Sequence, residues 1–349
     1  MSTAVYVGRD VTVTIQVPVE KEPHTIPSGS PYTVTLNHSP ISDRDLDGVA
    51  DEVAHVTVED TNGSPITPAS VDDSAGTVTF NSGDAGKNVF ISYSYDLNPY
   101  LAQEITVEPK QAVEGVDALG SDTIQAWAVL LKEISGSIRE VYKPGDSEQL
   151  TRIGLAHNPC ASGNGGTTTI SPGYVTGYPP SRAIDEDLST ETKPSGTAPY
   201  DWYLEVIFSE WRRIDEVLLT AAFWHNHNTN LKITYWDGFA WQDYAVFDET
   251  LYTHATPETK TFKKTVWTNK LRVQGTLDDQ FYTPSIFELQ AYQTEPSVHG
   301  VMVSWSQAGQ VVKIGLEGVV FPEGSIPSPK NSPVFIVTPF KARQVKTIG

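Results

Sequence analysis

The stretch that decides the fold of the chain's second half runs from residue 183 to residue 292. Four of its segments are WYLEV at 202–206, KITYWDG at 232–238, KLRV at 270–273 and SIFELQAY at 285–292. They are short, and apolar residues tend to alternate with polar ones. Successive side chains of a β-strand point to opposite faces, so this period of two predicts strands. We therefore expect residues 183–292 to form strands separated by turns.

The same period recurs on both sides of that stretch. It predicts strands at 5–17, 32–36, 55–58, 76–80, 89–95, 134–142, 298–305, 311–321, 334–338 and 340–345. Residues 122–133 are ambiguous, because they fit a short helix capped by Ser121 or Asp122 and also fit a strand. The predicted fold class is all-β, with one short helix.

Two stretches rich in proline, glycine or small polar residues interrupt this pattern. Residues 18–31 predict a domain boundary, and residues 156–182 predict a linker. With these breaks we expect a discontinuous core that carries two inserted β-sandwiches. The core comprises residues 1–19, 97–155 and 297–349, and the insertions are residues 20–96 and 156–296.

Composition limits the possible functions. A length of 349 residues favours two or three domains, and a net charge of -19 argues against ordinary DNA binding, because an acidic surface repels phosphate. Cys160 is the single cysteine, so no intrachain disulfide is possible. The longest apolar run, Ala126–Leu131, is too short to cross a bilayer, and residues 1–19 do not have the pattern of a signal peptide. We expect no membrane insertion.

The sharpest local motif is the acidic loop DRDLDGVADE at residues 43–52. Carboxylates at alternate positions converge when Gly48 permits a tight turn, and hard oxygen ligands suit Ca²⁺. The expected ligands are Asp43, Asp45, Asp47, the carbonyl of Val49, and Asp51 or Glu52. Ala54 occupies the twelfth position, so the bidentate glutamate of an EF-hand is missing, and the spacing resembles the shorter loops of thrombospondin type 3 repeats. The alternative is a solvated acidic turn.

Residues 183–292 as a whole resemble the discoidin or coagulation-factor C-type domain, a galactose-binding-like β-sandwich. The resemblance implies a structural cation, expected to be Ca²⁺, at Asp185, Asp187 and Thr190, with Glu288 on the closing strand. Two positions depart from the family, since Glu186 replaces its usual glycine and Glu191 replaces its tryptophan. A polar loop held by hydrogen bonds is the alternative.

The same family binds its ligands on loops at one end of the sandwich. In this chain, the segment WHNHN at 224–228 lies between two predicted strands. An aromatic ring stacks on a sugar ring, while histidine and asparagine can bond sugar hydroxyls. Trp224, His225, Asn226 and His227 are therefore the candidate ligand-binding residues. Zn²⁺ binding by the two histidines and a polar loop with Trp224 in the core remain open alternatives.

The core segments carry a second resemblance. Residues 120–125 and 133–142, together with residues 312–321 and the strands at 335–345 after a proline-rich loop, resemble a tail tube (major tail) protein of a tailed virus. That family implies stacked rings, usually hexameric, contacts with other tail proteins, and DNA as a non-specific passing cargo. It also implies a virion tail protein assembled in the host cytoplasm, with exterior domains that stabilise the tail or contact host-surface glycans.

No catalytic motif is visible, so we expect a protein that is not an enzyme. Two other functions remain open beside the tail tube. One is a carbohydrate-binding adhesin or tail-fibre component that forms no tube. The other is the non-catalytic, carbohydrate-binding part of a larger enzyme.

Overall fold

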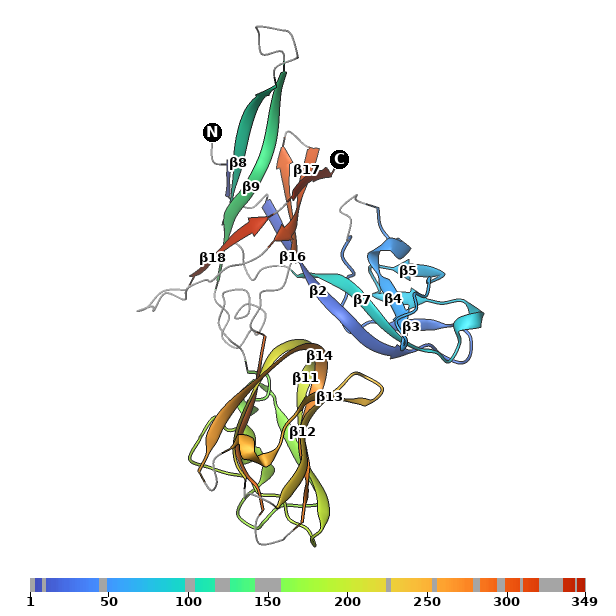
Figure 1. The fold of residues 1–349 in the computed structure, drawn as a ribbon. Helices are drawn as coiled ribbons and strands as arrows, with labels where there is room; N and C mark the ends of the chain where they lie inside the picture. The colour runs from blue at the N-terminus through green and yellow to red at the C-terminus, as the bar shows by residue number, and fades with distance from the viewer. Residues whose placement is uncertain are drawn as a thin grey trace. The chain divides into compact units, whose positions relative to one another are not determined.

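The computed structural model describes most of the chain (Figure 1). The described residues are 4–7, 11–43, 49–97, 104–116, 126–141, 158–223, 227–252, 256–278, 283–293, 299–307, 310–319, 335–342 and 344–348. They form strands β1 to β19 and five short 3-10 helices, without an α-helix among them, which confirms the predicted all-β class. No helix among the described residues is long and apolar enough to cross a membrane.

The chain divides into two compact units. The first comprises residues 1–19, 25–155 and 296–349, and the second comprises residues 20–24 and 156–295. The 3-10 helices are η1 (Val53–His55) and η2 (Ser82–Asp84) in the first unit, and η3 (Ser162–Asn164), η4 (Pro180–Ile184) and η5 (Glu249–Leu251) in the second.

A six-stranded sheet of the first unit joins distant parts of the sequence. Its order is β19 (Gln344–Ile348), β17 (Gln310–Val319), β16 (His299–Gln307), β2 (Val11–Thr25), β7 (Asn88–Leu97) and β4 (Thr57–Asp60). β2 and β16 are antiparallel, and Gly300 lies opposite Gln16. β2 continues to Thr25, so the boundary expected after residue 19 falls inside a strand.

Two further sheets complete the first unit. One has the order β1 (Ala4–Val7), β8 (Glu104–Val116), β9 (Ala126–Val141) and β18 (Phe335–Ala342), and Figure 1 shows β8 and β9 as a long hairpin. The other has the order β3 (Thr33–Thr35), β6 (Thr77–Thr79) and β5 (Ser70–Asp72).

The short helix expected over residues 122–133 is wrong from residue 126 onward, since those residues belong to β9. β9 pairs with β8 from Ala126 opposite Val116 to Arg139 opposite Glu104. Hydrogen bonds along a strand ladder outweigh the weak helix preference of a short segment. The strand alternative is confirmed for residues 126–133.

The second unit is a β-sandwich. Its sheet has the order β10 (Thr167–Ser171), β11 (Tyr200–Ala222), β14 (Glu258–Leu277), β12 (Asn228–Trp236) and β13 (Trp241–Val246). β15 (Ser285–Tyr292) pairs with the second half of β11, from Glu216 opposite Tyr292 onward. Irregularities in the β11–β14 pairing, after Ile207 and after Ile214, bend the long strands so that one sheet folds over on itself.

The core of this sandwich is built from one side of each strand. Trp202, Leu204, Ile233, Leu271 and Leu289 are among its fully buried side chains. Burial of such side chains is the main force that holds two sheet layers together. The alternation predicted from the sequence is therefore the alternation between this core and the outer surface.

The linker expected over residues 156–182 is wrong for its described part. Cys160 is fully buried in the sandwich core, and residues 167–171 form β10. The side-chain oxygen of Asn158 accepts hydrogen bonds from the backbone N–H groups of Cys160 (3.1 Å) and Ala291 (3.2 Å). Small polar residues resemble a linker in composition, but here their hydrogen bonds fasten the segment to the last strand.

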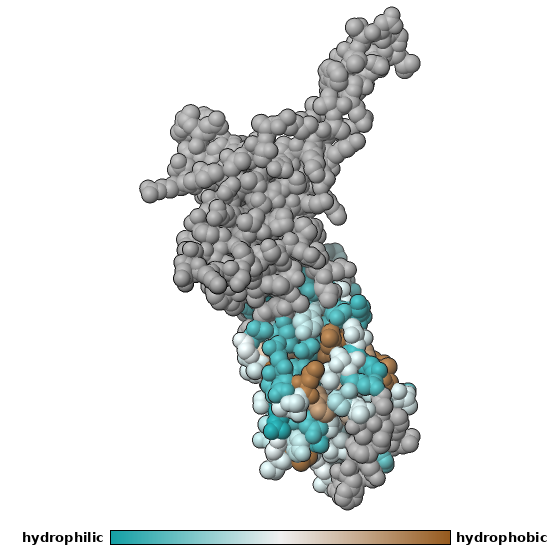
Figure 2. All heavy atoms as spheres, turned by 90° about the vertical axis from the view of Figure 1, so that its left-hand side faces the viewer, coloured by the Kyte–Doolittle hydropathy of each residue, from teal (hydrophilic) through white to brown (hydrophobic). Residues whose placement is uncertain are grey.

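Figure 2 shows one face of the second unit. Hydrophilic and intermediate residues cover most of the coloured surface, and hydrophobic residues appear on it as small separate areas. This distribution is ordinary for a β-sandwich in water, so hydrophobicity alone does not mark a binding surface there.

Candidate functional site

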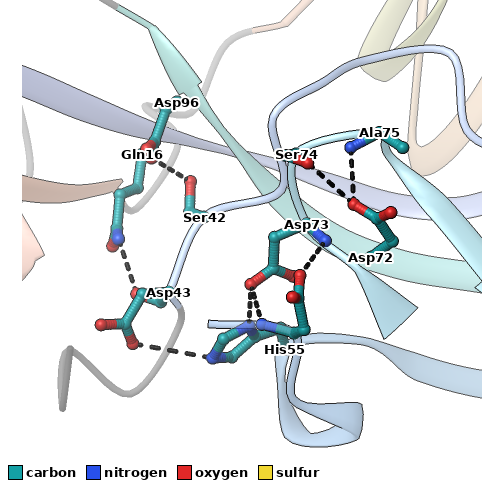
Figure 3. Close-up of polar contacts among 10 residues, drawn as sticks. Gln16, Ser42, Asp43, His55, Asp72, Asp73, Ser74, Ala75 and Asp96 are labelled. Atoms are coloured by element: carbon teal, nitrogen blue, oxygen red, sulfur yellow. Dashed lines mark hydrogen bonds and ion pairs between the residues drawn. The ribbon is translucent and has the colours of Figure 1, made fainter. Parts of the chain in front are cut away.

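Two members of the expected Ca²⁺ loop, Asp45 and Asp47, lie outside the described residues. Of the others, Asp43 has its carboxylate Oδ1 3.7 Å from Nε2 of His55, and its backbone carbonyl accepts a hydrogen bond of 2.7 Å from the side chain of Gln16 (Figure 3). The side chain of Val49 is 48% exposed. Asp43 therefore faces a histidine, which was not expected from the sequence.

Asp51, the last expected ligand, is bound reciprocally to Asp73. The N–H of Asp51 donates to Oδ2 of Asp73 (2.7 Å), and the N–H of Asp73 donates to Oδ1 of Asp51 (2.9 Å). The same Oδ2 of Asp73 lies 2.9 Å from Nδ1 of His55, whose side chain is fully buried. Asp51 has a φ of 62°, a conformation that side chains other than glycine adopt at a cost. These contacts hold the end of the acidic loop against the chain at residue 73.

The result is a partly buried acidic cluster in which Asp43 and Asp73 face the imidazole of His55, while Asp96 lies beside Ser42 (Figure 3). Asp96 belongs to it and accepts a hydrogen bond of 2.5 Å from Ser42. Burial raises the pKa of Asp96, and the negative charges of Asp43 and Asp73 raise it further. Within the described part of the chain, no three His, Cys, Asp or Glu side chains have metal-binding spacing. Ca²⁺ at residues 43–51 stays a prediction.

The second expected cation site is brought together by the fold. The hydroxyl of Thr190 donates to Oδ2 of Asp185 (2.8 Å), and the N–H of Asp187 donates to Oδ1 of Asp185 (3.0 Å). The carboxylate of Glu288 reaches the same loop from β15 and accepts a hydrogen bond of 3.1 Å from the N–H of Glu186. Asp185, Thr190 and Glu288 therefore lie at one loop with the backbone of Asp187, whereas the carboxylate of Asp187 accepts hydrogen bonds from the N–H (2.9 Å) and the hydroxyl (2.6 Å) of Ser189.

Glu288 is the unusual member of this loop site. It is 1% exposed, and its second oxygen, Oε1, is buried and accepts no hydrogen bond from the residues that the structure describes. Burial raises the pKa of Glu288 to about 8, and the charge of Asp185 adds to the effect. A buried carboxylate with an unsatisfied oxygen beside other oxygen donors fits the donor set that Ca²⁺ prefers.

Glu186 stands where the discoidin family, which this stretch resembles, usually has glycine. Its φ is 61°, which lies in the left-handed region where glycine is favoured. The family's glycine thus corresponds to a conformation that this chain keeps despite the side chain. In this conformation the backbone N–H of Glu186 donates to Glu288.

The expected sugar-binding loop is only partly described. Trp224, His225 and Asn226 lie outside the described residues. His227 is partly exposed and follows them directly, and its carbonyl accepts a hydrogen bond of 2.9 Å from the N–H of Asp278. The end of the loop is therefore bonded to the residue that directly follows β14.

Glu249 in η5 holds the end of this loop, and sequence reasoning missed it. It is 8% exposed, and its Oε2 accepts hydrogen bonds from the N–H groups of His227 (3.3 Å) and Asn228 (3.0 Å). A carboxylate that binds two backbone N–H groups immobilises the segment that carries them. An acidic residue 22 positions from His227 gives no local sequence signal, so only the fold could reveal this anchor.

The outer face of the sandwich carries a second group that the sequence did not single out. The guanidinium of Arg272 on β14 lies between two aromatic rings, with its carbon 4.1 Å from the ring centre of Tyr203 and 3.9 Å from that of Trp241. Its Nε donates a hydrogen bond of 2.7 Å to Glu205, which is 9% exposed. We call these four residues, Tyr203, Glu205, Arg272 and Trp241, the arginine ladder.

Trp236 lies beside the arginine ladder, next to Trp241. Its ring centre lies 5.6 Å from that of Trp241, with the planes tilted by 59°, and the Nζ of Lys270 lies 5.4 Å from it. Trp202, by contrast, is 1% exposed and belongs to the core. Trp236 and Trp241 are both partly exposed.

Comparisons with known proteins find similarity to solved structures alone. No family model matches, and no curated protein matches. Chitosan-binding module 1 of a chitosanase/glucanase from Paenibacillus sp. IK-5 is 18% identical, with a TM-score of 0.32, and the match covers 40% of this chain and 99% of the module.

Two further modules give similar values. The family 32 carbohydrate-binding module of C. perfringens NanJ, solved with galactose, is 17% identical with a TM-score of 0.32, over 40% of this chain and 99% of the module. A pectin-binding module is 19% identical with a TM-score of 0.28, over 36% of this chain and 88% of the module. At these identities and TM-scores, the likeness assigns no ligand to this chain.

Proposed function

We propose that this chain is a non-enzymatic binding protein that contacts glycans through the loop end of its second unit. The observation that carries the proposal is the anchoring of residues 227–228 by the buried carboxylate of Glu249. A loop fixed in advance loses little conformational entropy when it binds a ligand. The residues that precede the anchor, Trp224 to Asn226, have the side chains that stack on sugar rings and bond their hydroxyls.

A glycan array with the full chain tests this function. We expect binding by the unaltered protein and its loss in the Trp224→Ala variant. Thr229→Ala is the matched control, since Thr229 is exposed and directly follows the loop. The proposal is overturned if the unaltered protein binds no glycan, or if Trp224→Ala binds as well as Thr229→Ala.

We also propose that Ca²⁺ stabilises the glycan-binding unit at Asp185, Asp187, Thr190 and Glu288, and the first unit at residues 43–51. The unsatisfied Oε1 of Glu288 supports the first of these sites. Bound ligand stabilises a fold by mass action, so thermal unfolding in millimolar Ca²⁺ should occur at a higher temperature than in EGTA. An unchanged unfolding temperature would rule out both sites.

A second candidate function is the subunit of a viral tail tube. A tube subunit needs its first and last strands in one domain, and residues 11–25 and 344–348 belong to one six-stranded sheet here. In this proposal the protein forms rings with copies of itself, usually six, and DNA passes through them as cargo. Negative-stain microscopy separates the candidates, since hollow rings or stacked tubes support the subunit and isolated elongated monomers count against it.

A further inference from the structure

The outer face of the second unit carries an aromatic and cationic surface on its five paired strands. β10, β11, β14, β12 and β13 lie side by side in that order. The face is defined by Trp236, Trp241 and Lys270, with Tyr203 and Arg272 beside them. It is separate from the loop at residues 224–228, which precedes β12, whereas Trp236 ends that strand.

Strand alternation places these side chains outside the core. Leu271 and Val273 on β14 are fully buried, whereas Lys270 and Arg272 beside them are partly exposed. On β12, Ile233 is fully buried and Trp236 is partly exposed. Arg272 lies opposite Glu205 on one side and Thr234 on the other, so its side chain stands in the middle of the sheet.

Contacts within the protein hold the arginine and the two indole rings of this surface in place. Arg272 is held by Glu205 and by the rings of Tyr203 and Trp241, and Trp241 in turn contacts Trp236. Aromatic and arginine side chains that are already ordered lose little entropy on binding, and they dominate the energetics of binding surfaces.

Lys270 adds a positive charge to this face. Its Nζ lies over the ring of Trp236, and within the described part of the chain it forms no ion pair. The neighbouring cations do form ion pairs: Lys232 pairs with Asp243 (2.9 Å), and Arg272 pairs with Glu205 (2.7 Å). The face thus combines one ammonium group with two partly exposed indole rings.

This combination fits an acidic sugar. The apolar face of a sugar ring stacks on an indole ring, and a carboxylate on the same sugar ring can reach an adjacent ammonium group. The net charge of -19 repels anions in general, so an anionic glycan needs a local cation, and the ammonium group of Lys270 supplies one on this face. Nucleic acid is disfavoured, because its affinity requires several cations along the backbone.

We propose that the face formed by Trp236, Trp241 and Lys270 binds a glycan that contains uronic acid. The inference adds a second glycan surface to the proposed function, and it does not depend on the loop at residues 224–228. A ligand could span both surfaces, and the variants below separate the two.

Isothermal titration of the full chain with oligogalacturonate tests the proposal. We expect Lys270→Gln to weaken binding about tenfold, the value of one charge-assisted contact. Lys263→Gln is the matched control, because this substitution removes the same charge from the same strand. The side chain of Lys263 is 77% exposed. Trp236→Phe should also weaken binding, while circular dichroism confirms that each variant is folded.

Neutral galactan oligomers and single-stranded DNA complete the test. Lys270→Gln should leave any binding of the neutral oligomer unchanged. The proposal is overturned if oligogalacturonate does not bind, if Lys263→Gln weakens binding as much as Lys270→Gln, or if single-stranded DNA binds equally well. It is also overturned if Trp224→Ala abolishes oligogalacturonate binding while Lys270→Gln has no effect. On the glycan array, loss of binding in Trp224→Ala tests only the loop at residues 224–228.

Discussion

The arginine ladder allows a quantitative prediction for Arg272→Met. Methionine keeps an apolar stem against Tyr203 and Trp241 but removes the cation that binds Glu205. A charge-assisted hydrogen bond contributes about 1.5–3 kcal/mol, and each cation–π contact about 0.5–1 kcal/mol. Glu205 is 9% exposed, so its carboxylate would be left with little water. Because methionine still covers the rings, we expect the free energy of unfolding to fall by about 2–3 kcal/mol.

A double-mutant cycle with Glu205→Gln measures the pair directly. Glu205→Gln alone should cost about 1 kcal/mol, since the amide oxygen still accepts from Arg272. The double variant should be more stable than Arg272→Met alone, because no buried charge is left unpaired. Urea unfolding followed by tryptophan fluorescence is suitable, since six of the eight tryptophans lie in residues 156–295. The reasoning is refuted if Arg272→Met costs less than about 0.5 kcal/mol, or if the two effects simply add.

Three further predictions concern single residues. The raised pKa of Glu288 makes its contribution to the free energy of unfolding depend on pH when EGTA removes Ca²⁺. This contribution is fully present below about pH 4.5 and is lost as the pH rises toward 8. Glu288→Gln should remove this dependence in thermal unfolding, and a flat profile for the unaltered protein would contradict it. Asp73→Ala removes hydrogen bonds within the first unit and should cost about 2–4 kcal/mol in urea unfolding followed by circular dichroism. Asp72→Ala, at an exposed neighbour, should cost less than about 1 kcal/mol, and equal costs would refute the role of Asp73. Gly275→Ala would place its Cβ 2.6 Å from Leu231 and should cost about 1–3 kcal/mol; an unchanged melting temperature would show that the core yields there.

Much of the fold could be predicted from periodicity. The stretch at residues 202–206 alternates between the core residues Trp202 and Leu204 and the outer residue Tyr203, as expected for a strand with one buried face. The window at residues 122–133 was ambiguous because its apolar residues fit both periods. Its state depends on pairing with β8, which no local pattern encodes.

The candidate sites show the same limit. The loop at residues 185–190 and Glu288 could be predicted because a family resemblance links them across 102 positions of sequence. No such resemblance links Asp43 to His55, or Glu249 to His227. Those contacts form between residues that only the folded chain brings together, so composition and spacing could not reveal them.

The pairing of β2 with β16 has a consequence for folding during synthesis. Gln16 leaves the ribosome early, but its partner Gly300 is made much later. At about 5–20 residues per second, the edge of β2 that pairs with β16 waits for roughly 15–60 s. Over that interval an unpaired strand can join the wrong neighbour, as open strand edges do. Residues 156–295 are contiguous and can fold during this interval. In a nascent chain paused before residue 299, we therefore expect residues 156–295 to resist protease and the residues near the N-terminus to be cleaved.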